Sequence, residues 1–390
     1  MYRCTIIGIS DSHDLWFAPQ VSAAISKGKM FSGGKRHHDI VRSYLPEGAE
    51  WIDITVPLDD VFKEYERHDD IVVFASGDPL FYGFANTVQR KCPDVELTVY
   101  PSFNSLQMLV HRLNMPYHDM RAVSLTGRPW AKFDEALIRG EELIGCLTDK
   151  NKTPQAINER MLDYGYDNYT MFVGENLGNE EKERVGIYNA SAEYANPNCI
   201  LLQRKSPMPT RHGIPDNEFH LLDGRAKMIT KMPVRLCTLA VMELGNRQSF
   251  WDIGFCTGSV SIEAKLMFPH LNVTAFEIRQ EGKNLMQQNS RKFHVPGIHA
   301  IIGDFCSLDI ADLPRPDCVF IGGYGGRMKE MLEKVRTILQ PGGCIVFNSV
   351  SEESRNTFIE VTSALSTTAE VVYTIKVDDN NPITIIKAYD

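Results

Sequence analysis

The chain has 390 residues, more than one hydrophobic core usually organises, so we expect two or three domains. Hydrophobic residues make up 43% of it, but no run reaches the roughly 18 apolar residues that a membrane helix requires, and residues 1–10 lack the layout of a signal peptide, so we expect a cytoplasmic protein. A net charge of -9 with a pI near 5.7 disfavours a nonspecific nucleic-acid binder, and nine cysteines without a CxxC pair argue against a zinc site or a disulfide framework.

In the first half of the chain, short apolar runs alternate with helical patterns. This alternation is typical of α/β architecture with mainly parallel strands. We expect strands at 3–9, 71–75, 95–100, 142–148, 170–174 and 199–203.

A polar, proline-containing stretch at 204–224 separates the two halves, because its composition cannot easily bury backbone. We place a linker at 206–225 and domains at 1–205 and 226–390. In the second domain, 230–244 has the spacing of an amphipathic helix. Strands are expected at 249–253, 272–276, 299–302, 317–322 and 343–347. Together they predict one doubly wound, Rossmann-like nucleotide-binding sheet of ordinary domain size.

The most specific pattern is WDIGFCTGS at 251–259. It places Asp252 at the end of a strand, then a glycine-containing turn, and Glu277 ends the next strand. A doubly wound sheet holds a nucleoside in this way, since glycines let the backbone approach the ligand and the second carboxylate can take both ribose hydroxyls. Cys256 stands at the middle glycine of a dinucleotide fingerprint, which favours S-adenosylmethionine (SAM), a donor without phosphate, over NAD. Ser259 is a good N-cap residue, so the positive end of its helix can face the donor's carboxylate.

Four loops in this half suit one ligand, because ligands of open α/β sheets bind at the carboxyl ends of the strands. We expect 252–259 to hold the methionine end, Glu277 the ribose, and Asp304 with Phe305 the adenine. The fourth loop, 322–326, has four glycines that either admit a ligand or form only a flexible turn. The predicted cofactor-binding residues of this half are Asp252, Gly254, Cys256, Thr257, Gly258, Ser259, Glu277, Asp304, Phe305, Gly322 and Gly323.

This half resembles the class I methyltransferases. More narrowly, ITK at 229–231, DIGFCTGSVSIE at 252–263 and VFIGGYGG at 319–326 are similar to the decarboxylating precorrin methyltransferases of cobalamin biosynthesis. That family usually has glycine where Cys256 stands. The Asn/Asp-Pro-Pro-Tyr/Phe signature of amino-group methyltransferases is missing at 321–325, so nitrogen is a poor candidate for the methyl acceptor.

The first half has SGDPLFYG at 76–83 and PSFNSLQ at 101–107, each directly after an expected strand, and it resembles the tetrapyrrole methylase family. The resemblance implies two α/β subdomains, about 1–110 and 115–205, that hold SAM in the cleft between them. It also implies a second set of cofactor-binding residues: Ile9, Gly77, Asp78, Phe81, Tyr82 and Ser105.

Three further motifs are similar to the branch of that family that methylates precorrin at carbon 5: GGKRHHDIV at 33–41, SLTGRP at 124–129 and FVGENLG at 172–178. The first loop, 8–13, is poorer in glycine than in that branch. We expect Ser10 to narrow the floor of the donor pocket.

Both halves in this order resemble the bifunctional precorrin methyltransferases. The resemblance implies SAM-dependent methylation of a reduced corrinoid precursor, precorrin-6B or its cobalt form, at carbons 5 and 15, with loss of carbon dioxide from the ring C acetate. It also implies two SAM sites and a homo-oligomer. Catalysis would consist mainly of holding an electron-rich ring carbon in line with the activated methyl.

Because such a substrate bears carboxylates, basic residues near the donor loops are candidate anchors, although each is also compatible with a solvated surface charge. These are Lys231, Arg235, Arg327, Arg36, Arg128 and Lys132. We assign substrate positioning to Tyr324, Lys231 and Arg327. His37 and His38 have no further ligands at a recognised spacing, so no metal site is predicted.

Two alternatives stay open. A class I RNA methyltransferase with an accessory domain would show a basic surface, against the acidic balance of this chain. An enzyme with only its second half active, whose first half is a binding scaffold, is suggested by the changed loop at 8–13.

Overall fold

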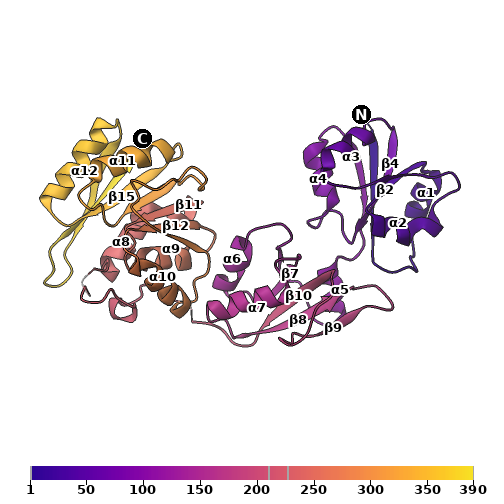
Figure 1. Ribbon diagram of the computed structural model, residues 1–390, viewed down its shortest axis with the longest axis horizontal. Coiled ribbons are helices and arrows are strands. Elements are labelled where there is room, and N and C mark those ends of the chain that lie inside the picture. Colours follow the sequence, from indigo (N-terminus) through magenta and orange to yellow (C-terminus); the bar gives the residue numbers. More distant parts are fainter. Residues whose placement is uncertain (1, 210, 226–227, 390) are drawn as a thin grey trace. The chain divides into compact units, whose positions relative to one another are not determined.

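The computed structural model describes residues 2–209, 211–225 and 228–389, which form two compact units. The first unit contains the residues up to Arg128, Glu142–Asn158 and Tyr169–Lys205, and the second contains Pro129–Glu141, Glu159–Asn168 and the residues from Ser206 onward. Figure 1 labels many of the elements of both units. The mixed α/β class expected from the sequence is confirmed, with three sheets in all among the described residues.

The first sheet, in the first unit, has the strand order β3-β2-β4-β1-β5, and all its pairings are parallel. Its strands are β1 Arg3–Ile9, β2 Met30–Gly33, β3 Glu50–Asp53, β4 Asp70–Ser76 and β5 Glu96–Tyr100. Its helices are α1 Pro19–Lys27, α2 Lys35–Val41, α3 Leu58–Tyr65 and α4 Phe84–Lys91. Strand β4 reads DIVVFAS and is buried over its five central residues, as expected for a strand covered on both faces.

The second sheet has the order β6-β7-β10-β8-β9. Its strands are β6 Arg121–Ser124, β7 Leu143–Leu147, β8 Tyr169–Glu175, β9 Arg184–Ile187 and β10 Asn198–Arg204. Helix α5 Ser105–Arg112 precedes β6, α6 Ala131–Arg139 follows β6, and α7 Pro154–Asp163 follows β7. Only β6 and β7 pair in parallel, so the expectation of mainly parallel strands is wrong for this sheet. The connection from β8 to β9 is too short for the crossover helix that a parallel pair requires.

The third sheet, in the second unit, has the order β13-β12-β11-β14-β15-β17-β16. Its strands are β11 Ser249–Ile253, β12 Asn272–Glu277, β13 Ile298–Ile302, β14 Cys318–Ile321, β15 Cys344–Ser349, β16 Thr368–Ile375 and β17 Ile383–Tyr389. Its helices are α8 Met232–Met242, α9 Ser259–Met267, α10 Glu281–Lys292, α11 Met328–Ile338 and α12 Glu352–Ala364. The five predicted strands are present and parallel, whereas the antiparallel pair β16 and β17 was not predicted.

The strand order of this third sheet reverses at β11. The chain runs outward to β12 and β13 on one side and returns to β14 on the other. Such a switch point opens a crevice at the carboxyl ends of the strands, which is where ligands bind in open α/β sheets.

The described residues of the stretch expected as a linker, 206–225, belong to the second unit and pack against its helices. Ile214 and Phe219 are buried in one apolar cluster with Ile262 of α9 and Met286 of α10. Burial of these two side chains fixes the path of the stretch over the helices. Within the described ranges, no helix is long and apolar enough to cross a membrane.

Candidate functional site

A cavity of about 710 Å³ lies at the switch point of the third sheet. This volume falls in the range of roughly 300 to 1,000 Å³ that is usual for small-molecule sites. Predicted residues that line it are Lys231, Asp252, Gly254, Cys256, Thr257, Ser259, Glu277, Asp304, Phe305, Gly322, Gly323, Tyr324 and Arg327. Of the residues predicted for this half, Gly258 and Arg235 are not among the lining residues.

The turn after β11 is built as the sequence suggests, with one shift. Gly258, at φ +77°, is the N-cap residue of α9, and the helix begins at Ser259, so the expectation of Ser259 as N-cap is wrong by one position. Gly254 has φ +80°, and a Cβ there would lie 2.7 Å from the backbone nitrogen of Gly323. Glycine is therefore required where these two loops meet at the cavity.

Cys256 stands in the same turn with φ +51°, a left-handed conformation that favours glycine. Its thiol donates to the carbonyl oxygen of Met228 at 3.0 Å, and its backbone N–H donates to Oε2 of Glu277 at 2.9 Å. These two contacts tie the turn to the cavity wall on one side and to the end of β12 on the other.

Asp252 presents an unpaired carboxylate oxygen at the cavity. Its side chain is buried, Oδ2 accepts from the Ser261 hydroxyl at 2.5 Å, and Oδ1 has no hydrogen-bond partner among the described residues. Burial raises the pKa of this carboxyl to about 7, and the charge of Glu277 adds to the shift. A buried carboxylate without a partner is costly, so a cationic ligand group would stabilise it. The methionine ammonium of SAM meets this requirement.

Glu277 is buried at the end of β12 and already holds protein donors. Oε2 accepts from the backbone of Cys256, while Oε1 accepts from the backbone N–H of Arg279 at 3.0 Å and from its Nη1 at 2.9 Å. A carboxylate offers about four acceptor positions, so room for a ribose hydroxyl remains. Arg279 lines the cavity and was missed by sequence reasoning.

Asp304 and Arg327 bind each other. Arg327 Nη1 lies 2.5 Å from Oδ2 of Asp304, and the guanidinium also pairs with Glu330. Hydrogen bonds from Ser307 and Arg327 lower the pKa of Asp304. Asp304 and Arg327 already form an ion pair. If Asp304 accepted a hydrogen bond from an adenine amine, or Arg327 bound a substrate carboxylate, the ligand would bind a residue that keeps this partner.

Phe305 and Tyr324 supply apolar surface to the cavity. Phe305 is buried and lies edge-on to Trp251 and Phe276, whereas Tyr324 packs its ring against Phe347. The loop between β16 and β17 also contributes lining residues that were not predicted: Val377, Asn380 and Asn381.

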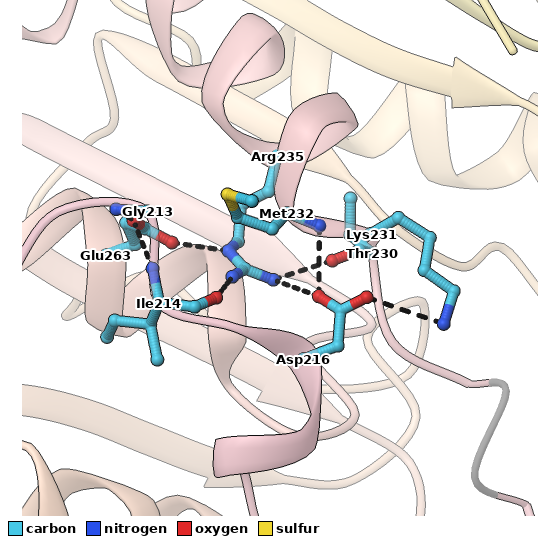
Figure 2. A network of polar contacts seen from close by, with 8 residues as sticks. All are labelled: Gly213, Ile214, Asp216, Thr230, Lys231, Met232, Arg235 and Glu263. Atoms are coloured by element: carbon cyan, nitrogen blue, oxygen red, sulfur yellow. Dashed lines mark hydrogen bonds and ion pairs between the residues drawn. The ribbon is translucent and has the colours of Figure 1, made fainter. Parts of the chain in front are cut away.

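Figure 2 shows why Arg235 is not a substrate anchor. Its guanidinium is fully buried, and it donates through Nε to Glu263 at 2.5 Å and through Nη1 to the carbonyl oxygen of Thr230 at 2.7 Å and to Asp216 at 3.4 Å. It also donates through Nη2 to the carbonyl oxygen of Ile214. The expectation that Arg235 binds a carboxylate of the substrate is therefore wrong.

The same network positions Lys231 at the cavity. Asp216 accepts from the backbone N–H of Met232 at 2.9 Å and pairs through Oδ2 with Lys231 Nζ at 3.4 Å (Figure 2). The Lys231 side chain remains one-third exposed and lines the cavity, so its ammonium stays available to a ligand.

The first unit has a smaller cavity, of about 280 Å³. All six residues predicted for this half line it: Ile9, Gly77, Asp78, Phe81, Tyr82 and Ser105. Ser10 and Asp11 line it as well. A Cβ on Gly77, at φ +60°, would lie 2.9 Å from the Cα of Asn104, so the GDP turn and the start of α5 touch backbone to backbone.

Tyr82 closes part of this smaller cavity in a left-handed conformation, at φ +55°. Its hydroxyl donates to the carbonyl oxygen of Ala122 at 3.2 Å, and the guanidinium of Arg128 lies 5.0 Å from its ring centre. Arg128 also donates to the Ser124 hydroxyl at 2.7 Å, and Lys132 pairs with Glu135 at 2.9 Å. Of the three basic candidates in this half, Arg36 lines the cavity and the other two do not.

His37 and His38 have different surroundings. His38 stacks on Trp51 with ring centres 4.1 Å apart, whereas His37 contacts Ser76. Within residues 2–209, 211–225 and 228–389, no group of three or more His, Cys, Asp or Glu side chains is arranged to hold a metal ion.

Comparison with known proteins finds one family for each half of the chain. Residues 18–191 match the family described as tetrapyrrole (corrin/porphyrin) methylases, and residues 222–390 match the precorrin methyltransferase domain. A cobalt-precorrin-6B C(15)-methyltransferase (decarboxylating) of Salmonella typhimurium is 34% identical over 34% of this chain and 68% of its own length. The chain belongs to the precorrin methyltransferases.

Two further precorrin methyltransferases extend the match. A precorrin-6Y C(5,15)-methyltransferase (decarboxylating) from a Sinorhizobium species is 29% identical over 90% of this chain and 85% of its own length. A cobalt-precorrin-7 C(5)-methyltransferase of Salmonella typhimurium is 24% identical over 52% of this chain and 99% of its own length. The expected methyltransferase class and the fusion of two methylase domains are confirmed.

Proposed function

We propose that the chain transfers two methyl groups from SAM to a reduced corrinoid precursor, precorrin-6B or its cobalt form, at carbons 5 and 15, with loss of carbon dioxide from the ring C acetate. The observation that carries this proposal is the pair of cavities, each built from the residues that the two domain families would use for a methyl donor. Relatives named for each of the two reactions match this chain.

We assign methylation at carbon 15 and decarboxylation to the larger cavity. When bound, SAM supplies a methyl group on a positively charged sulfur. Asp252 Oδ1 would pair with the ammonium of its methionine part, and Glu277 would accept from its ribose. The close approach of Gly254 and Gly323 leaves the backbone of two loops open to the cavity, where the donor and the acceptor carbon would meet.

The chemistry needs positioning more than side-chain catalysis. The ring carbon supplies the electron pair for the new carbon–carbon bond, and the sulfur keeps the pair of the bond that breaks. The ring carbon then loses its proton, while the departing carbon dioxide leaves an electron pair that takes up a proton. Lys231 and Tyr324 on the cavity wall would hold the macrocycle, Lys231 through a substrate carboxylate.

We assign methylation at carbon 5 to the smaller cavity. Its backbone loops at Gly77 and Asn104 would surround the second donor, with Ile9 and Phe81 as apolar contacts. Its volume, about 280 Å³, lies just below the usual range for small-molecule sites. This small volume favours a second candidate function, in which the first unit binds a ligand without transferring a methyl group.

The test is mass spectrometry of the corrinoid product after the full chain is incubated with SAM and precorrin-6B, in the metal-free and cobalt forms. A gain of two methyl groups with loss of one carbon dioxide supports the proposal. One methyl group with decarboxylation would mean that the first unit does not methylate that substrate. No change with either form would contradict the proposed function.

A further inference from the structure

The motif GGKRHH at 33–38 lies beside the smaller cavity and has no part in the function proposed so far. Gly33 ends β2 and α2 begins two residues later, so Arg36 and His37 stand in the first turn of that helix. Both side chains reach the hydroxyl of Ser76, the last residue of β4. Arg36 Nη2 donates to Ser76 Oγ at 2.8 Å, and His37 Nε2 lies 2.9 Å from the same atom.

The tautomer of His37 follows from its other ring nitrogen. Nδ1 accepts from the backbone N–H of Gly34 at 3.3 Å, so it carries no proton. Burial, together with the charge of Arg36, lowers the pKa of His37 to about 4, and the ring is neutral near pH 7. Its single ring proton is therefore on Nε2 and points at Ser76.

These two contacts leave the Ser76 hydroxyl able to donate a hydrogen bond but not to accept another one. A hydroxyl oxygen accepts through two lone pairs and donates one hydrogen. Arg36 and His37 occupy both lone pairs, and no acceptor for the hydroxyl hydrogen occurs among the residues that the structure describes. Ser76 is exposed and lines the cavity, so its hydroxyl hydrogen is free to donate to a ligand there.

Arg36 adds a second set of donors at the same place. Nη1 lies 3.3 Å from Oδ1 of Asp11, which fixes the guanidinium, and the Arg36 side chain is 46% exposed at the cavity. A guanidinium has five N–H groups, so donors remain beside the Ser76 hydroxyl. Two neighbouring donors, one of them charged, match the two oxygens of a carboxylate.

We infer that Ser76 and Arg36 form a carboxylate-binding subsite in the cavity of the first unit, with His37 as the positioning residue that turns the Ser76 hydroxyl toward the ligand. This inference rests on the proposed function, because both of its reactants carry carboxylates. SAM has one on its methionine part, and the corrinoid precursor has several on its side chains.

The test compares Ser76→Ala, which removes the donor, with Ser76→Thr, which keeps a hydroxyl. Steady-state methylation at carbon 5 by the full chain gives kcat and KM for the corrinoid, and calorimetry gives the affinity for SAM. A hydrogen bond to a charged group corresponds to a loss of about ten- to hundredfold in binding. We expect that loss in one of the two constants for Ser76→Ala, an unchanged kcat, and recovery in Ser76→Thr.

The constant that changes identifies the source of the carboxylate. A higher KM for the corrinoid indicates a side chain of the substrate, and a weaker SAM affinity indicates the donor; either supports the subsite. His37→Ala should change the same constant by a smaller factor, since it frees one lone pair of Ser76 but leaves the hydroxyl. A purely structural role of His37 would instead lower the melting temperature and leave the constants of the folded protein unchanged.

Ser26→Ala is the matched control, because the Ser26 hydroxyl donates to the carbonyl oxygen of Ser22 within α1 and lies outside the cavity. Unchanged constants in Ser76→Ala would overturn the inference. If the wild-type chain forms no product methylated at carbon 5, the proposed function of this unit fails. Direct titration of SAM and of the corrinoid into the same variants then tests the subsite separately.

Discussion

The two cavities of this chain offer different surroundings to what we propose is the same donor. The larger one places two buried carboxylates, Asp252 and Glu277, at the ends of adjacent parallel strands. The smaller one has no buried acidic residue in its lining, which consists of backbone segments, apolar side chains and polar groups that include Ser76 and Arg36. The contrast shows that the larger cavity offers buried negative charge to a ligand, whereas the smaller one offers backbone segments, the Ser76 hydroxyl and the partly exposed Arg36 guanidinium.

The largest effect is expected from Gly254→Ala, which acts on the larger cavity alone. The new Cβ would lie 2.7 Å from the Gly323 nitrogen at a residue with φ +80°, so the two loops must separate. Strain of about 1 to 3 kcal/mol at such a position predicts a loss of SAM affinity there of roughly 5- to 150-fold. Methylation at carbon 15 and decarboxylation should fall with it, as read from the product mass.

Gly245→Ala is the control for this change, since a Cβ at Gly245 meets nothing closer than a ring carbon of Phe268 at 3.5 Å. Equal losses in the two variants would show that the effect is general and not specific to the cavity.

Glu277→Ala should weaken SAM binding to the larger cavity through the ribose. Leaving the ribose hydroxyls unpaired costs roughly 1 to 3 kcal/mol, and the backbone of Cys256 loses its acceptor as well. Calorimetry of the full chain measures this loss, with the exposed Glu281→Ala on α10 as control. An unchanged affinity would refute the ribose assignment.

The larger cavity should also respond to pH where the smaller one does not. The pKa of Asp252 is raised to about 7, so the carboxylate that would pair with the ammonium of SAM is lost as the pH falls through 7. We expect affinity to fall by about tenfold from pH 8 to pH 6, and the Asp252→Asn variant to show a weak affinity without this slope. A wild-type slope that persists in Asp252→Asn would place the titrating group elsewhere.

The same shift affects the stability of the unliganded chain. Because the folded-state pKa is raised, the protonated carboxyl favours the native state below the unfolded-state pKa, and this contribution is lost as the pH rises from about 4 to about 7. Asp252→Asn should therefore unfold at a higher urea concentration than the wild type at pH 8 and show little difference at pH 4. The opposite order would contradict an unpaired, buried carboxylate.

The smallest effect is expected at Cys256. Its left-handed backbone costs roughly 1 kcal/mol relative to glycine, and both Cys256→Gly and Cys256→Ala lose the thiol contact to Met228, so the glycine variant should be about 1 kcal/mol more stable than the alanine variant. Cys256→Ala keeps the Cβ and therefore the backbone strain. Urea denaturation at pH 7 compares the three proteins. Equal stability of the glycine and alanine variants would remove the strain argument.

Local patterns predicted much of the fold. The bounds of β11 match the prediction to the residue, because a buried strand, a glycine turn and a helix follow one another in WDIGFCTGS. The second sheet was predicted less well, since strand direction depends on where β10 inserts and no local pattern encodes that. The pair β16 and β17 follows no alternation of strand and helix, and it was missed.

The lining of both cavities was predicted from motifs, but the partners of the lining residues were not. Arg235 looked like an anchor in sequence, yet Glu263 and Asp216, which lie 28 and 19 residues away, enclose it. Arg327 and Asp304 were assigned to different ligands and instead bind each other across 23 residues. Such pairings arise from tertiary packing, so residue type and spacing cannot reveal them.

Counting bound SAM shows whether one chain holds two donor sites. Calorimetric titration of the full wild-type chain should give two molecules per chain, and Gly254→Ala and Gly77→Ala should each remove a different one. Gly77→Ala is the counterpart in the smaller cavity, because its Cβ would lie 2.9 Å from the Cα of Asn104. A single site in the wild type, lost in Gly254→Ala and retained in Gly77→Ala, would contradict the account.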